Sequence, residues 1–329
     1  MEQDDIFRAI QAAVEDTPLL MIGSGSSAPY GLPGMQELGE HLLKQLDSKY
    51  SGEKCWNTFR ENLQAGQDLE SALSDITFPS DILNDVKWET WSLISSRDFD
   101  LFGRILFGHE ELALSKLLKK LYQATPQKID IITTNYDRVI EYACDLAQIP
   151  VANGFYGCYH KHFDKEFPSR RSINLIKVHG SLDVFCDTHG VAVSVPIMLR
   201  ERVPGLVPEI ITPGASKYAA VLTGTPRQLL SAADERIGQA RSFLCIGYGF
   251  NDAQIQENIL TKARTGTPVI LLTMKVADHA AHLLANNAKN YISIQKGEKD
   301  NTTDICINRD IVTLDGTYWT VDGLMEIID

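Results

Sequence analysis

The chain has 329 residues, of which 44% are hydrophobic, so it is long enough to bury a sizeable core as one large or two modest domains. Lys and Arg number 31 against 43 Asp and Glu, and the formal net charge of −12 excludes a general affinity for nucleic acid or anionic membranes. No apolar run approaches the length of a membrane span and the acidic N-terminus is unlike a signal peptide, so we expect a cytoplasmic protein that does not associate with membranes.

Short apolar runs alternate with helical patterns along most of the chain. Continuous apolar strands that alternate with helices indicate a parallel sheet covered on both faces, and therefore an α/β fold of the Rossmann-like type. In chain order, the expected elements are a helix at 5–15, a strand at 18–22, a glycine-rich loop at 23–34, a helix at 35–46, a strand at 129–133, a helix at 138–147, strands at 173–178, 191–195 and 204–212, a helix at 226–240, a strand at 243–247, a helix at 253–264, a strand at 268–273 and a helix at 276–286.

Two segments depart from this alternation. Residues 53–122 carry helix patterns and no convincing strand, which predicts a helical insertion that forms a small domain. Near the other end, Asp315-Gly316 lies between residues 311–314 and 317–321, and this pattern predicts a two-residue β-hairpin turn. The expected domains are a Rossmann-like domain from residues 1–35 and 123–295, the helical insertion at 36–122, and a C-terminal β-hairpin extension at 296–329.

The first glycine-rich loop, Gly23-Ser24-Gly25-Ser-Ser-Ala28, has the G-x-G-x-x-A spacing of a dinucleotide-binding loop. Glycines allow backbone N–H groups to approach a pyrophosphate, and the N-terminus of a following helix adds a favourable dipole. A plain turn explains the same residues equally well. No second strand ending in Asp or Glu follows about twenty residues later, which disfavours a hydride-transferring dehydrogenase.

Polar side chains follow two further strands. Thr134, Asn135 and Asp137 come after the strand at 129–133, and His179 follows the next long apolar run. An amide donates and accepts hydrogen bonds without titrating, whereas a His titrates near neutrality, so the pair could orient a sugar and move a proton. More ordinary roles are a helix cap for Asp137 and a satisfied core position for His179.

A second glycine-rich loop, Gly247-Tyr-Gly249-Phe-Asn251-Asp252, follows the strand at 243–247. A tight strand-to-helix turn with Asn251 or Asp252 as the cap would account for it. Because ligands of parallel sheets bind beyond the carboxyl ends of the strands, we expect both glycine loops and the polar residues above to lie together.

With these four motifs in this order, the chain resembles the sirtuin family over about residues 18–295, and specifically its bacterial NAD-consuming branch. The resemblance implies that Asn135 orients the nicotinamide riboside and the attacking water, and that His179 is the catalytic base. It implies NAD-binding roles for the other motif residues, which are Gly23, Ser24, Gly25, Thr134, Asp137, Gly247, Gly249, Asn251 and Asp252. It also implies that Thr212-Pro213-Gly214 closes over NAD and that Thr273 lies near the adenosine end.

One departure from the sirtuin deacylases is the missing zinc module. Those enzymes carry two C-x-x-C pairs, and no cysteine pair of this chain has that spacing. We therefore expect no bound metal and reduced core thiols at all six positions, which are Cys55, Cys144, Cys158, Cys186, Cys245 and Cys306. The zinc-free members that the chain resembles are NAD hydrolases of bacterial antiviral defence.

The first functional hypothesis is an NAD glycohydrolase that releases nicotinamide and ADP-ribose. The alternatives are a sensor that binds NAD or ADP-ribose without turnover, and an NAD-dependent protein deacylase or ADP-ribosyltransferase. Free destruction of NAD would kill the host, so we expect a gated homo-oligomer, and the resemblance favours a hexameric DNA-translocating ATPase as partner. The tryptophans of the insertion and the tail either mark contact surfaces or fill the core; they are Trp56, Trp88, Trp91 and Trp319.

Overall fold

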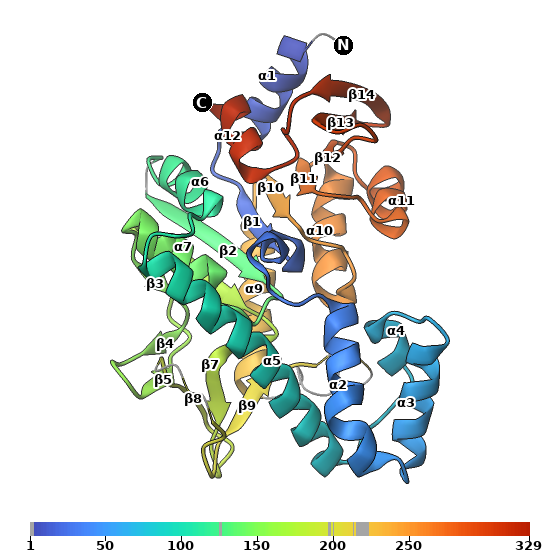
Figure 1. The fold of residues 1–329 in the computed structure, drawn as a ribbon. Helices are drawn as coiled ribbons and strands as arrows, with labels where there is room; N and C mark the ends of the chain where they lie inside the picture. The colour runs from blue at the N-terminus through green and yellow to red at the C-terminus, as the bar shows by residue number, and fades with distance from the viewer. Residues whose placement is uncertain (1–2, 125–126, 197–198, 200, 213, 215–223) are drawn as a thin grey trace.

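The computed structural model describes residues 3–124, 127–196, 199, 201–212, 214 and 224–329 (Figure 1). Within these residues the centre of the molecule is a nine-stranded sheet. Its order is β14 (Asp310–Asp315), β13 (Thr302–Ile307), β12 (Tyr291–Lys296), β11 (Val269–Thr273), β10 (Phe243–Ile246), β1 (Leu19–Ile22), β2 (Lys128–Thr133), β6 (Ser172–Lys177) and β3 (Val151–Ala152). All neighbouring pairs from β12 to β3 are parallel, which confirms the predicted α/β class.

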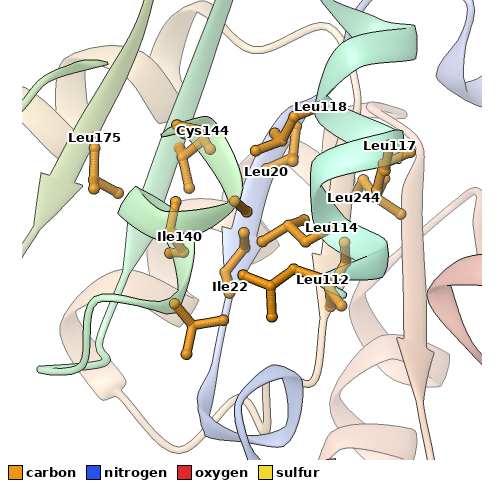
Figure 2. Close-up of a cluster of buried hydrophobic side chains, with 14 of the residues drawn as sticks. Leu20, Ile22, Leu112, Leu114, Leu117, Leu118, Ile140, Cys144, Leu175 and Leu244 are labelled. Atoms are coloured by element: carbon orange, nitrogen blue, oxygen red, sulfur yellow. The ribbon is translucent and has the colours of Figure 1, made fainter. Parts of the chain in front are cut away.

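Helices cover both faces of this sheet, as the continuous apolar strands predict. One face carries α1 (Gln3–Val14), α6 (Ala113–Leu121), α7 (Val139–Ala147) and α12 (Val321–Ile328). The other face carries α9 (Gly224–Gln239), α10 (Ala253–Thr265) and α11 (Asp278–Asn287). Figure 2 shows Leu114 and Leu118 of α6 packed with Ile140 of α7 around Leu20 and Ile22 of β1. Each such fully buried aliphatic side chain stabilises the fold by roughly 1.5–3 kcal/mol.

A group of helices packs beside the sheet. The domain predicted at 36–122 stays a prediction, and α6 at its end packs on the sheet itself. The group comprises α2 (Met35–Tyr50), α3 (Lys54–Gln64), α4 (Leu69–Leu73) and the long α5 (Ser80–Leu106), and we call it the helical lobe (Figure 1). Trp56 lies at the centre of the lobe's own apolar cluster, whereas Trp88 and Trp91 pack from α5 into the main core. All three indoles are buried, so they fill cores rather than form exposed contact surfaces.

The structure also contains a second sheet, which the sequence analysis does not predict. It has five antiparallel strands in the order β4 (Phe155–Tyr156), β5 (Lys161–Phe163), β8 (Ala192–Ser194), β7 (Gly180–Cys186) and β9 (Val207–Ile210). Only the strands at 191–195 and 204–212 were expected here. The others are too short for a period-two pattern, or continue directly from β6 through His179, which hides the boundary.

A C-terminal hairpin exists, formed by β13 and β14, but the predicted turn at Asp315-Gly316 and the predicted strand at 317–321 are wrong. The turn lies at Asn308 and Arg309, whose φ angles of 48° and 90° match the left-handed pair of a type I′ turn. Gly316 instead follows the end of β14 at Asp315, and the next residues lead into α12, a helix that the sequence analysis does not predict. The Asp-Gly signal marks a position that needs a positive φ, 124° at Gly316, without marking a hairpin.

Two further observations concern surfaces and cysteines. No helix in the described part of the chain is long and apolar enough to cross a membrane.

The six cysteines are all free thiols, but only Cys144 and Cys245 are buried and Cys158 is exposed. The expectation that all six are core thiols is therefore wrong, because apolar neighbours in sequence do not by themselves place a residue in a core.

Candidate functional site

The four motifs follow four strands that are neighbours in the sheet, in the order β10, β1, β2 and β6. Their carboxyl ends open on a cavity of about 360 Å³, a size typical of small-molecule sites. The catalytic and NAD-binding residues predicted from the four motifs all line this cavity, namely Gly23, Ser24, Gly25, Thr134, Asn135, Asp137, His179, Gly247, Gly249, Asn251 and Asp252. The expectation that these residues lie together is confirmed by their arrangement, while their roles toward a ligand stay predictions.

The two glycine loops pack backbone against backbone. The N–H of Gly23 donates to Ile246 O at 3.0 Å, and the N–H of Gly25 donates to Gly247 O at 3.1 Å. A Cβ at Gly23 would lie 2.4 Å from Gly247 O, and one at Gly247 would lie 2.3 Å from Ser26 N. The glycines are therefore required for contact between the loops. The N–H groups of Gly23 and Gly25 are already used there, so the predicted contact of this loop with a pyrophosphate, if made, uses other groups of the loop.

The first loop also does not open directly into a long helix. One short 3₁₀ turn, Ser24–Ser26, lies within the loop, a second, Ala28–Tyr30, begins at its end, and α2 begins only at Met35. The dipole of a helix N-terminus acts within its first turn. The helix contribution expected from the G-x-G-x-x-A spacing is therefore not present immediately after Gly25.

Asn135 is held in one orientation by both of its amide protons. Its Nδ2 donates to Gly23 O at 3.1 Å and to Ser27 Oγ at 3.2 Å. Because a backbone carbonyl only accepts, the atom facing Gly23 O must be the amide nitrogen. The side-chain oxygen Oδ1 is therefore the group that Asn135 offers to the cavity, and it acts as a hydrogen-bond acceptor.

The loop that carries Asn135 is fixed from within. Thr133 Oγ1 donates to Ile22 O at 2.7 Å and accepts from the N–H of Asn135 at 3.0 Å. Asp137 Oδ1 accepts from the N–H of Val139 at 3.1 Å, in the first turn of α7, while the N-cap position itself is Arg138. Burial raises the pKa of the Asp137 carboxyl, and the nearby charge of Lys177 opposes that rise.

Lys177 is a buried lysine, 4% exposed, at the end of β6. Its Nζ donates to the carbonyl oxygens of Tyr136 and Asp137 and to Glu141 Oε1 at 2.9 Å. An ammonium group has three protons, so all three are satisfied. Two of the three partners are successive carbonyls of the loop that carries Asn135, so Lys177 fixes this loop to β6.

Helix α5 of the helical lobe also contacts the loop that carries Asn135, through hydrogen bonds between Asp98 and Arg138. The fully buried Asp98 accepts from the backbone N–H of Arg138 at 2.8 Å and forms two bonds with its guanidinium. Further along α5, Trp91 Nε1 donates to Leu182 O at 2.8 Å, just beyond His179. One helix therefore holds both the Asn135 loop and the strand that follows His179.

His179 forms a short contact with the second glycine loop. Its Nε2 lies 2.7 Å from Asp252 Oδ2, and both side chains are nearly buried. Asp252 also caps α10, because its Oδ1 accepts from the N–H groups of Gln254 and Ile255 at 3.1 Å. The cap expected at Asn251 or Asp252 is therefore Asp252.

The cavity is also lined by residues that were not predicted as site residues. Ser27 Oγ accepts a hydrogen bond from Asn135. Tyr136 lies in the loop that carries Asn135, and Tyr248 lies in the second glycine loop. Glu70 comes from α4 of the helical lobe. Sequence spacing could not place Glu70 there because the lobe's position depends on its packing. The remaining apolar lining is Leu32, Pro33, Met35, Leu38, Ile94 and Ile211, with Gly34.

Two minor expectations have mixed outcomes. In the segment expected to close over NAD, Thr212 is buried and Pro213 lies outside the described residues. Thr273 ends β11 and is not among the residues lining the cavity.

Among the described residues, no group of three or more His, Cys, Asp or Glu side chains is arranged to hold a metal ion.

Comparison with known proteins gives one family match. Residues 130–292 match the family model described as the SIR2-like domain, which spans β2 to β12 and includes Asn135, His179 and Asp252. No curated protein matches the chain.

Solved structures similar to the chain carry Sir2 names. A Sir2 homologue–NAD complex is 14% identical, with 89% of this chain and 88% of that chain covered and a TM-score of 0.49. A Sir2 homologue variant in complex with ADP-ribose is 13% identical, with 88% and 89% covered and a TM-score of 0.46. Another variant in complex with 2′-O-acetyl-ADP-ribose is 15% identical, with 91% and 92% covered and a TM-score of 0.47.

Proposed function

We propose that this chain is a sirtuin-like NAD⁺ glycohydrolase that cleaves NAD⁺ to nicotinamide and ADP-ribose. The observation that carries the proposal is the pairing of an acceptor and a base in one cavity. Asn135 offers Oδ1, and His179 offers an imidazole held by Asp252, at the carboxyl ends of neighbouring strands. The match of residues 130–292 to the SIR2-like domain supports an NAD-utilising site at this place.

The chemical character of the cavity suits the cationic end of NAD⁺. Its lining residues include the acidic residues Glu70, Asp137 and Asp252, and none of its described lining residues is Lys or Arg. A negative potential favours the positively charged nicotinamide and the oxocarbenium-like ribose that forms as it leaves. We assign the phosphates and the adenosine end to the side formed by the two glycine loops, where Ser24 and Asn251 supply polar groups.

The reaction needs little from the protein except position and one base. The bond between ribose C1′ and the nicotinamide nitrogen breaks, and its electron pair neutralises the ring nitrogen, so no general acid is required. Asn135 Oδ1 accepts a hydrogen bond from a ribose hydroxyl or from the attacking water, which orients either group. His179 takes the proton of the water as its oxygen bonds to C1′, and the proton then passes to solvent.

Purified chain incubated with NAD⁺ tests this proposal, with nicotinamide and ADP-ribose separated by chromatography. The same reactions run with an acyl-lysine peptide separate the alternatives. Hydrolysis without peptide supports the glycohydrolase, and turnover that requires peptide would replace it with a deacylase. Binding of NAD⁺ by calorimetry without any turnover, at every protein concentration tried, would replace it with a sensor.

We further propose that the activity serves bacterial anti-phage defence and is gated by assembly. The support is the resemblance to the zinc-free, NAD-consuming sirtuins and the toxicity of uncontrolled NAD⁺ loss. The proposed state is a homo-oligomer of low basal activity, with a hexameric DNA-translocating ATPase as the activating partner. Light scattering combined with the NAD⁺ assay tests it, because a monomer with full unstimulated turnover would contradict gating.

A further inference from the structure

The contact between His179 and Asp252 determines more than the shape of a loop. An ionised carboxylate only accepts hydrogen bonds, so Asp252 Oδ2 at 2.7 Å requires a proton on Nε2 of the ring. In a neutral imidazole the other nitrogen, Nδ1, then carries the lone pair. Nδ1 has no hydrogen-bond partner in the part of the chain that the structure describes, and the ring lines the cavity.

The position of the Asp252 carboxylate is itself fixed by the backbone. Its Oδ1 accepts from two N–H groups in the first turn of α10, and the side chain is 5% exposed. A carboxylate at a helix N-terminus is also stabilised by the helix dipole. Asp252 is therefore a rigid acceptor, and the ring of His179 has little freedom to turn away from it.

A helix cap alone does not account for this arrangement. Capping requires one acceptor oxygen, and Thr320 supplies only one where it caps α12. Asp68 caps α4 through Oδ1, and its second oxygen accepts from the hydroxyl of Ser71 in the same turn. At Asp252 the second oxygen instead reaches a residue 73 positions away in the sequence.

We propose that Asp252 is a positioning residue that selects the Nε2–H tautomer of His179 and leaves Nδ1 as the catalytic base. This inference rests on the proposed glycohydrolase function, and it assigns Asp252 a different role from the NAD contact that the family resemblance implies. A water proton moves to Nδ1 as the water oxygen bonds to C1′, and the resulting imidazolium keeps its ion pair with Asp252. The carboxylate itself is not protonated in this step, as in serine protease triads.

The exchange Asp252→Asn tests the inference with little change in shape. The Asn side chain can still cap α10 through its oxygen, because Asn is among the best capping residues. Its NH₂ group then faces Nε2 and donates to it, which places the ring proton on Nδ1 and removes the base. The matched control is Asp68→Asn, which makes the same exchange at the cap of α4, outside the cavity.

The expected result has two parts. Imidazole ¹⁵N spectra, with the His179 signals identified by their loss in His179→Gln, show the Nε2–H form in the native chain and the Nδ1–H form in Asp252→Asn. The kcat for NAD⁺ hydrolysis falls by roughly 10²–10⁴-fold, while the unfolding temperature stays close to the native value. Asp68→Asn keeps the native spectrum and native kcat.

The outcomes separate this inference from the proposed function. If the native chain shows the Nδ1–H form, or if Asp252→Asn keeps native kcat, Asp252 does not select the base. The tautomer is measured without NAD⁺, so the inference can fail while hydrolysis is confirmed. Equally, the tautomer can be as inferred while no hydrolysis is found. If Asp252→Asn unfolds, Asp252→Ser replaces it, because Ser keeps the cap and removes the second oxygen. That variant should then show mixed tautomers and reduced kcat, and native values of both would overturn the inference.

Discussion

Gly25 and Gly247 lie in direct backbone contact, with the N–H of Gly25 bonded to Gly247 O at 3.1 Å and no room for a side chain between them. A Cβ at Gly25 would meet Gly247 Cα at 2.8 Å. The substitution Gly25→Val must therefore push the two glycine loops apart. We expect it to lower the unfolding temperature and to weaken NAD⁺ binding together.

The matched control for this substitution is Gly34→Ala. Gly34 also lines the cavity, but a Cβ there meets nothing within 4 Å and its φ of −84° suits any residue. We expect native stability for it. Calorimetric titration and thermal unfolding check both variants, and a Gly25→Val chain with native stability would mean that the loops are not packed as described.

Removal of the Asn135 side chain should stop the reaction without unfolding the protein. In Asn135→Ala the carbonyl of Gly23 keeps its bonds from Ser26 N and Ser26 Oγ, so no buried acceptor is left without a partner. We expect kcat for NAD⁺ to fall by roughly 10²-fold or more with a small change in unfolding temperature. The control is Asn62→Ala, which removes an amide bonded to Ala72 O away from the cavity. Near-native turnover of Asn135→Ala would remove this residue from the site.

His179→Ala should abolish turnover, because the chain then has no base at the end of β6. The control is His41→Ala, since His41 contacts Glu89 in the helical lobe and does not line the cavity. Chromatographic measurement of nicotinamide release distinguishes the two. Equal loss of activity in both variants would point to a general effect on folding and against a specific role for His179.

Lys177→Met should reduce both stability and turnover. The substitution leaves two loop carbonyls and Glu141 without their buried partner, and breaking a buried ion pair costs about 3–5 kcal/mol. Adding Glu141→Gln removes the uncompensated charge, so we expect the double variant to regain part of the free energy of unfolding. The loop that carries Asn135 stays unanchored, so kcat should remain low. Recovery of kcat along with stability would show that Lys177 acts only through charge balance.

Glu209 should make stability depend on pH. Burial raises its pKa from 4.5 to about 7, and the charge of Lys87 only partly offsets this. Between these values the folded state holds a proton that the unfolded state has lost, so the free energy of unfolding falls as pH rises from about 4.5 to 7. The change is on the order of 1–3 kcal/mol. Urea unfolding of the native chain and of Glu209→Gln across this range checks it, and parallel curves would contradict it.

The sequence predicts this fold well where strands are long and buried. The central strands and their helices follow from continuous apolar runs, and the order of strand and polar loop places Asn135 and His179 at one edge. The short strands of the second sheet and the turn at Asn308 depend on local dihedral angles and cross-strand contacts. Dihedral angles and cross-strand contacts leave no periodic pattern in the sequence. The hairpin turn is therefore predicted at Asp315-Gly316, although it lies at Asn308 and Arg309.

The sequence predicts which residues line the cavity, but it does not predict the hydrogen bonds between them. The motif residues line one cavity as expected, but no spacing rule indicates that Asp252 bonds to His179 or that Glu70 reaches the cavity from α4. The contact between the two glycine loops was not predicted either, since a G-x-G pattern does not reveal whether the nearest neighbour is a phosphate or another loop. Partners across long sequence separations are determined by packing, which a single sequence does not show.

The distances in sequence between the paired site residues have a consequence for synthesis of the chain. Asn135 and Gly23 are 112 positions apart, and His179 and Asp252 are 73 apart. Such non-local contacts form late in folding, because each must first close a long loop of chain. A ribosome-bound fragment that ends before Asp252 has neither the second glycine loop nor the partner of His179. Under the proposed function, we therefore expect such an unfinished fragment to lack NAD⁺ hydrolysis, because its site is not yet assembled.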